Sequence, residues 1–162
     1  MVPLEIFAVV VVAIAMAIAL AHLVELPGKM RLPKEQYLAV HTIYYPGFTI
    51  SGASEPLGVV VAALLAALTG SALLTSASVA LAVMQLIYWV WIHPVDNFWI
   101  RSFRLRSAGR ANFELGQAAL PETGFAEWTS LRDRWEYSHA ARAILAVLAF
   151  VMLVTAVVGS SR

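Results

Sequence analysis

The sequence of 162 residues contains no cysteine. This absence excludes disulfide bonds, thiolate nucleophiles and metal sites built on sulfur ligands. A metal ion in this protein would therefore have to be bound by histidine and carboxylate side chains. Only four histidines and ten acidic residues are present for that purpose.

Charge is also scarce in this sequence. Only 13% of the residues are charged, whereas 60% are hydrophobic and the mean hydropathy is +0.77. Soluble domains are about half apolar and about a quarter charged, so the composition predicts a protein that resides in lipid. The net charge of +1 gives no reason to expect nucleic acid as a partner. The length is that of a single domain.

The hydrophobic residues are gathered in four long runs. A bilayer core about 30 Å thick requires about 20 apolar residues in a helix, and the runs predict helices over about 3–25, 47–69, 71–93 and 136–158. Thr69 and Gly70 alone separate the second run from the third, which predicts an antiparallel hairpin. The predicted fold class is therefore all-α: one transmembrane domain that forms an antiparallel four-helix bundle.

The basic residues predict the orientation of this bundle. Nine of them lie in the two long connections, 26–46 and 94–135, whereas the opposite face has only Arg162 near the C-terminus. Lysine and arginine accumulate on the cytoplasmic side of membranes, so both connections should be cytoplasmic and both termini outside. The aromatic side chains predicted to anchor the cytoplasmic interface are Tyr44, Tyr45, Tyr88, Trp89, Trp91, Trp135 and Tyr137.

Three of the predicted helices carry a histidine and an acid three residues apart at their cytoplasmic ends. This spacing places both side chains on one helix face. Soluble four-helix bundles bind two metal ions through glutamates and Glu-x-x-His pairs, although two of the pairs here have the reverse order. With the lone acid of the second helix added, the predicted metal ligands are His22, Glu25, Glu55, His93, Asp96, Glu136 and His139.

These ligands would suit one or two ions of non-haem iron, manganese or zinc. Structural explanations stay open for each pair. Glu136 suits the start of a helix without any metal and has Arg132 one turn away. Glu25 has Lys29 as a nearby partner, and Asp96 would cap the end of the third helix.

Glu55 and Arg142 are the ionisable residues placed furthest inside the predicted spans. In a helix that begins near Pro46, Glu55 lies about 13 Å along the axis, where an unpaired carboxylate costs several kcal/mol. Alternatively, Ser54 caps a shorter helix and Glu55 stands in its first turn. Arg142 lies one turn deeper than His139, and an arginine inside a span normally faces a partner or a polar cavity.

The residues around these groups resemble those of a known family. Residues 22–30, 44–56 and 131–142 are similar to small bacterial four-helix membrane proteins, a family of unknown function grouped with the anthrone oxygenases. The resemblance covers nearly the whole chain, and its most specific residues are Arg134, Trp135, His139 and Arg142. It implies a multi-pass protein of a bacterial inner (plasma) membrane. It also implies oxidation of an anthrone to an anthraquinone without an added organic cofactor.

The first functional hypothesis is a membrane-embedded oxidoreductase of the oxygenase type, acting on a lipophilic aromatic or quinone-like substrate from the bilayer. The predicted catalytic residues are His139, Glu55 and Arg142. His139 or Glu55 would remove a proton from the substrate, or join the metal site. Arg142 would orient a carboxylate or stabilise an enolate-like anion.

Two alternatives stay open at this point. One is a non-enzymatic accessory or structural membrane protein whose polar face contacts a partner or anionic lipid. The other is a haem-binding membrane subunit with two imidazoles as axial ligands. The alanine-rich run Ala62–Ala67 permits close helix contact, either within one chain or in a homo-oligomer.

Overall fold

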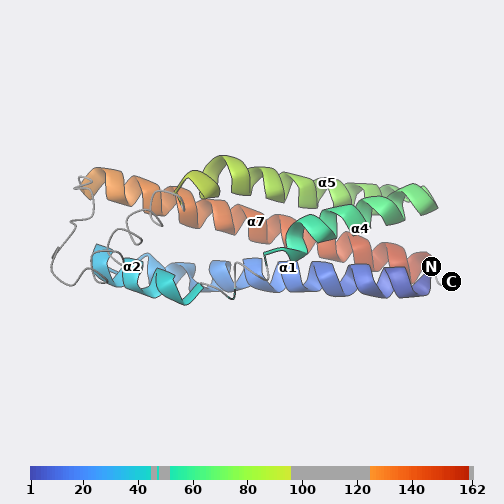
Figure 1. The fold of residues 1–162 in the computed structure, drawn as a ribbon, viewed down its shortest axis with the longest axis horizontal. Helices are drawn as coiled ribbons and strands as arrows, with labels where there is room; N and C mark the ends of the chain where they lie inside the picture. The colour runs from blue at the N-terminus through green and yellow to red at the C-terminus, as the bar shows by residue number, and fades with distance from the viewer. Residues whose placement is uncertain (45–46, 48–51, 96–124, 161–162) are drawn as a thin grey trace, which may run out of the picture.

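The computed structural model describes residues 1–44, 47, 52–95 and 125–160, and Figure 1 shows their arrangement. Every regular element within these ranges is helical, which confirms the predicted all-α class. The α-helices are α1 (Val2–Lys29), α2 (Lys34–His41), α4 (Ser54–Thr69), α5 (Ala72–Ile87) and α7 (Phe125–Ser160). A 3-10 turn, η1 (Thr42–Tyr44), follows α2, and a π-helical turn, η2 (Tyr88–Ile92), extends α5.

The four longer α-helices lie side by side along the molecule (Figure 1). Helices α1 and α5 each contact both α4 and α7. Gly70 ends α4 in the left-handed conformation, with φ of 68°, and Ser71 caps α5 by accepting a hydrogen bond from the backbone of Leu74. A two-residue turn is therefore present, one residue later than predicted: Thr69 ends α4, and Gly70 and Ser71 connect it to α5. Helices α4 and α5 form the predicted antiparallel hairpin.

Among the described residues, three helical stretches are long and apolar enough to cross a membrane: Val2–Lys29, Ala72–Val95 and Glu127–Ser160. The apolar helix α4 has 16 residues, so it is about 24 Å long at 1.5 Å per residue. That is shorter than a bilayer core of about 30 Å. These lengths and compositions agree with an integral membrane protein.

Two separate apolar clusters hold the helices together. The first joins α1, α4, α5 and α7 and includes six fully buried alanines, which allow the helices to approach closely. Those alanines are Ala8, Ala62, Ala77, Ala143, Ala146 and Ala149. The second cluster joins α2, η1, the end of the α5–η2 stretch and the start of α7. Its buried members are Tyr37, Leu38, Tyr44, Ile92, Val95, Trp128 and Trp135.

Helix α7 begins earlier than its apolar residues predict. The prediction placed residues 94–135 in a loop and started the last helix at 136, but α7 begins at Phe125 and has 36 residues. The additional turns are too polar for lipid, yet they bury Trp128 and Trp135 in the second cluster. At about 54 Å, the helix is longer than one bilayer crossing requires.

The other predicted helix ends also differ from the structure. Helix α1 continues through Pro27 to Lys29, beyond the predicted end at residue 25. Helix α4 is described from Ser54, whereas the prediction began it at 47 and residues 48–51 lie outside the described part of the chain. Glu55 therefore stands in the first turn of α4, as the shorter-helix alternative stated. The proposed Ser54 cap is wrong, because Ala53 occupies that position.

Candidate functional site

Six buried polar side chains lie between the two apolar clusters. Along α7, residues 136–142 separate Trp135 of the second cluster from Ala143 of the first. The six side chains come from α1, α4 and α7, and none is more than 6% exposed. We call them the polar layer: His22, Lys29, Glu55, Glu136, His139 and Arg142.

The deeper half of the polar layer is an ion pair between α7 and α4. Arg142 Nη2 donates a hydrogen bond to Glu55 Oε2, and Gln85 Nε2 donates to the same oxygen at 2.7 Å. The Arg142 guanidinium also lies over the ring of Tyr88, 5.4 Å from its centroid. The prediction that an arginine inside the span faces a partner is therefore confirmed, and the partner is Glu55.

His139 adjoins this ion pair and defines a hydrogen-bond direction. Arg142 Nη1 lies 3.2 Å from His139 Nδ1. A guanidinium has only donors, so Nδ1 must accept, and a neutral imidazole then carries its proton on Nε2. His139 Nε2 and Arg142 Nε are buried and have no hydrogen-bond partner among the described residues. The layer thus presents two N–H donors that nothing in the described chain uses.

The rings around His139 form a continuous aromatic wall. His139 packs against His22, with ring centroids 4.2 Å apart, and against Trp135, at 4.0 Å. Tyr44 also packs against His22, with ring centroids 4.8 Å apart. Such rings suit contact with a flat apolar molecule, since aromatic pairs favour centroid separations of about 4.5–7 Å.

The outer half of the polar layer is centred on Lys29. Its Nζ lies 3.5 Å from Glu25 Oε2 and 3.3 Å from Glu136 Oε2. It also lies over the rings of Tyr44 and Trp135, 5.3 and 5.0 Å from their centroids. The pairing of Glu25 with Lys29, which the sequence left open as a structural explanation, is confirmed.

Two tyrosine hydroxyls link helix α2 and turn η1 to the outer half of the polar layer. The Tyr37 hydroxyl donates to Glu136 Oε1 at 2.7 Å, and the Tyr44 hydroxyl donates to Glu25 Oε2. Burial, followed by the neighbouring carboxylates, raises the pKa of both phenols above the usual value, so both stay protonated donors. Burial and the charge of Lys29 lower the pKa of His41 to about 3.

The alternative pairing of Glu136 with Arg132 is wrong. Arg132 instead pairs with Asp133, at 2.7 Å between Nη2 and Oδ1. Glu136 is fully buried and faces α1 and α2, where Lys29 and Tyr37 contact it. A buried carboxylate needs such partners, whereas a pair at the surface contributes little.

The predicted metal ligands are distributed over several separate contacts. His22 and His139 adjoin, but each described carboxylate of the set contacts a lysine or arginine. His93 packs on Trp89, with ring centroids 4.8 Å apart, and Asp96 lies outside the described residues. Within the described ranges, no three or more histidine and acidic side chains gather in a way that could hold a metal ion. The metal site as a whole stays a prediction.

The geometry of the two adjoining imidazoles bears on the haem alternative. Their ring centroids are 4.2 Å apart. Axial imidazoles on opposite sides of one metal need about 2 Å from each nitrogen to the ion, and the ring centres then lie further apart than the observed separation. His22 and His139 as placed therefore leave no room for a porphyrin between them.

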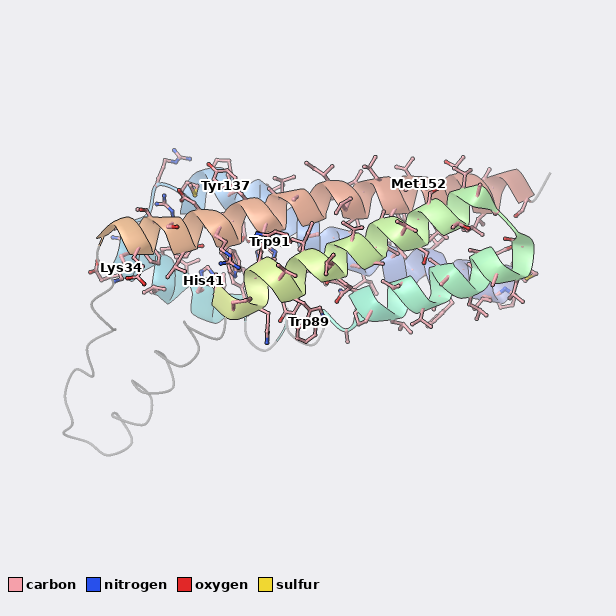
Figure 2. All side chains as sticks on the ribbon, turned by 90° about the horizontal axis from the view of Figure 1, so that it is seen from above. Lys34, His41, Trp89, Trp91, Tyr137 and Met152 are labelled. Atoms are coloured by element: carbon pink, nitrogen blue, oxygen red, sulfur yellow. The ribbon has the colours of Figure 1, made fainter. Side chains whose placement is uncertain are left out.

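Of the seven predicted interfacial anchors, Tyr45 lies outside the described residues, and Tyr88 is part-buried beside Arg142. The other five divide into two groups. Trp89, Trp91 and Tyr137 are 58%, 46% and 59% exposed, and Trp89 and Tyr137 extend away from the helices in Figure 2. Tyr44 and Trp135 are buried in the second cluster, so the prediction of an anchoring role is wrong for these two. The rings of Tyr44 and Trp135 pack against Lys29 of the polar layer, because α2 and the first turns of α7 enclose them.

Three residues of the site were missed by sequence reasoning. Lys29 was read only as a loop charge or a partner of Glu25, Gln85 was not considered, and Tyr37 lay in a connection predicted to be a loop. Gln85 carried a usable signal, because a polar amide inside an apolar run is uncommon in a membrane span. Tyr37 carried none, since nothing local indicates that α2 folds back onto Glu136.

Comparison with known proteins adds no relative. No protein-family model, no curated protein and no solved structure matches this chain. The resemblance to the anthrone oxygenase family therefore stays a prediction, carried by residues 22–30, 44–56 and 131–142 alone. What can be said of function depends on the geometry of the polar layer.

Proposed function

We propose that the chain is an integral protein of a bacterial inner membrane that crosses the bilayer four times, with both termini outside. Its three long apolar helices and the shorter α4 supply the crossings, and the basic residues of the two connections favour the cytoplasm. The polar layer then lies near the cytoplasmic end of the spans. A lipophilic substrate would reach it from the bilayer.

At that layer, we propose an oxygenase-type oxidoreductase that acts on a lipophilic aromatic or quinone-like substrate. One observation carries this proposal: Arg142 Nε and His139 Nε2 are buried donors without a hydrogen-bond partner among the described residues. Preorganised donors in a water-poor site stabilise an oxygen that becomes negative during a reaction. The aromatic wall beside them suits the flat body of such a substrate.

The proposed chemistry needs a base as well as these donors. Glu55 Oε2 accepts from both Arg142 and Gln85, which leaves Oε1 to remove a proton from an activated CH₂ group. The electron pair moves to the adjoining enolate-like oxygen, which Arg142 and His139 stabilise as donors. This anion transfers electrons to O₂ and a C–O bond forms at the carbon. The resulting peroxide anion takes the proton back from Glu55 Oε1 and becomes a hydroperoxide. Loss of water then leaves a carbonyl, so that CH₂ and O₂ become C=O and H₂O.

The direction of the Arg142–His139 hydrogen bond changes the role given to His139. As a neutral acceptor at Nδ1, His139 has its proton on Nε2 and acts as a donor. Of the two bases that the sequence suggested, we therefore keep Glu55. The metal-dependent form of the hypothesis is less well supported, because the carboxylates that would bind the ion contact Lys29 and Arg142.

The test combines oxygen consumption with metal analysis of protein purified in detergent without chelators. With an anthrone as substrate, we expect turnover, and Arg142→Lys and Glu55→Gln should each lower kcat by roughly 10²–10³-fold. Asp133→Asn is the matched control, since Asp133 is part-exposed and contacts Arg132. Stoichiometric metal that His139→Ala removes, together with the activity, would overturn the metal-free mechanism.

A non-enzymatic role is the second candidate, and the pairing of the buried acids favours it. Glu55 and Glu136, and the less buried Glu25, each contact a cationic side chain. These ion pairs would also suffice to hold α1, α4 and α7 together, with the Tyr37–Glu136 hydrogen bond adding α2. Absence of turnover over a panel of anthrones, quinols and phenols, with a normally folded protein, would leave this structural role as the better account.

A further inference from the structure

A pocket lies at the end of the molecule furthest from the polar layer, and the proposed function does not use it. Its volume is about 320 Å³, and it is formed by the first turn of α1, the α4–α5 turn and the last turns of α7. Figure 1 shows the two termini and this turn at the same end. Leucine and valine side chains line part of it, and its polar lining is Glu5, Thr69, Ser71, Thr155 and Ser160. We call it the terminal pocket.

The hydroxyl groups of the terminal pocket offer a ligand acceptors and few donors. Thr69, Thr155 and Ser160 donate their hydroxyl protons to backbone carbonyls three or four residues earlier in their own helices, at 2.7, 2.7 and 2.8 Å. A hydroxyl group has one proton and two lone pairs. Once the proton is engaged, lone pairs are what the side chain presents to a ligand.

Glu5 supplies the negative charge of the terminal pocket. It is the one ionisable side chain of the described lining, and it forms no ion pair within the described part of the chain. It stands in the first turn of α1. Two helix starts, of α1 and α5, and two helix ends, of α4 and α7, meet here. Their opposite partial charges offset one another, so the carboxylate decides the sign.

We propose that the terminal pocket binds a primary ammonium group carried by a small amphiphile. An ammonium group has three donors and no acceptor, which matches a lining of one carboxylate and several acceptor hydroxyls. Quaternary ammonium groups are instead recognised by aromatic cages, and the part of the lining that the structure describes contains no aromatic side chain. The volume lies at the low end of the range for ligand pockets, about 300–1,000 Å³, which suits a headgroup or a short alkylamine.

The two sources of this chemistry can be separated with matched ligands. The full chain in detergent is heated with dihexanoyl phosphatidylethanolamine or its phosphatidylcholine counterpart, and with hexylamine or trimethylhexylammonium. We expect the primary ammonium of each pair to raise Tm by roughly 5 °C near saturation, and the trimethylated partner to leave it unchanged. If only the phosphatidylethanolamine raises Tm, the terminal pocket is a site for a lipid headgroup. If hexylamine raises Tm as well, the pocket is also a site for small amines.

Variants locate the effect. Glu5→Gln should weaken the apparent affinity at least tenfold, and Thr155→Val should weaken it several-fold, whereas Glu35→Gln, an exposed acid on α2, should not change it. Equal shifts with the trimethylated ligands would overturn the proposal. So would an unchanged response in Glu5→Gln or, should that variant fail to fold, in Thr155→Val. None of these results depends on the oxidoreductase proposal.

Discussion

At the scale of single residues, the main feature of this protein is that buried polar side chains contact residues far away in the sequence. Glu55 contacts a residue 87 positions later, and Tyr37 contacts one 99 positions later. A charge buried in or near lipid is tolerated only when it is paired and hydrogen-bonded. The polar layer therefore depends on both members of each pair.

This dependence predicts the effect of substitutions at the Arg142–Glu55 pair. Arg142→Met should lower the free energy of unfolding by about 3–5 kcal/mol, because the Glu55 carboxylate is left buried without its counter-charge. Unfolding in mixed micelles of dodecylmaltoside and SDS measures the change. Arg132→Met is the matched control and should cost at most about 1 kcal/mol, since its partner Asp133 is 41% exposed.

A double variant separates a lost contact from an uncompensated charge. Arg142→Met combined with Glu55→Leu should recover most of the lost stability, because no buried charge remains. A double variant as unstable as Arg142→Met alone would show that packing around the guanidinium, and not the Glu55 charge, accounts for the loss.

At the scale of elements, the short helix α2 is held mainly by side chains. Tyr37 and Leu38 are buried in the second cluster, and Tyr37 packs edge-on against Trp128, with ring centroids 5.2 Å apart. A helix of eight residues is not stable alone in water. Its position must therefore come from these tertiary contacts, with the Tyr37–Glu136 hydrogen bond fixing its distance from α7.

Removal of that hydrogen bond gives a prediction with a close control. Tyr37→Phe keeps the ring but leaves Glu136 Oε1 without its donor, which should cost about 1–3 kcal/mol of stability. Tyr137→Phe alters an equivalent phenol on the exposed face of α7 and should be nearly neutral. Thermal unfolding in detergent, with limited proteolysis of the α2 region, reports both effects. Equal behaviour of the two variants would contradict the role assigned to Tyr37.

At the scale of the whole molecule, the two apolar clusters divide the protein into two parts. The alanine-rich first cluster belongs to the helices whose outward faces carry leucine, isoleucine and valine, as expected for contact with lipid. The second cluster encloses tryptophans and tyrosines beyond that region. Helix α7 runs through both clusters. Its length of about 54 Å fits an extension outside the bilayer core at its start, followed by one crossing.

This division and the basic residues together predict the topology. Single cysteines are informative because the natural chain has none. Applied to intact cells, a membrane-impermeant maleimide should label Ser160→Cys and leave Lys34→Cys unlabelled until the membrane is permeabilised. Labelling of Lys34→Cys from outside, with Ser160→Cys protected, would reverse the proposed orientation. Labelling of both from outside would contradict the three crossings proposed between Lys34 and Ser160, those of α4, α5 and α7.

The sequence by itself determined the helical class, the apolar helices and the turn between α4 and α5. These features depend on hydrophobicity summed over neighbouring residues and on a glycine at a helix end, both of which are local properties. It also indicated that Glu25 would find Lys29 one turn later, and that Arg142 required a partner. Neither inference needs knowledge of another helix.

Only the tertiary structure decided which partner each group took and where the aromatic rings lie. Arg142 pairs with Glu55, Glu136 contacts Lys29 and Tyr37, and the Trp135 side chain is buried. Sequence spacing places residues on one face of one helix but carries no information on the rotation of the next helix. That rotation determines which charged side chains and aromatic rings are buried. A buried polar group without a partner lowers the stability of the whole fold and not only that of its own segment.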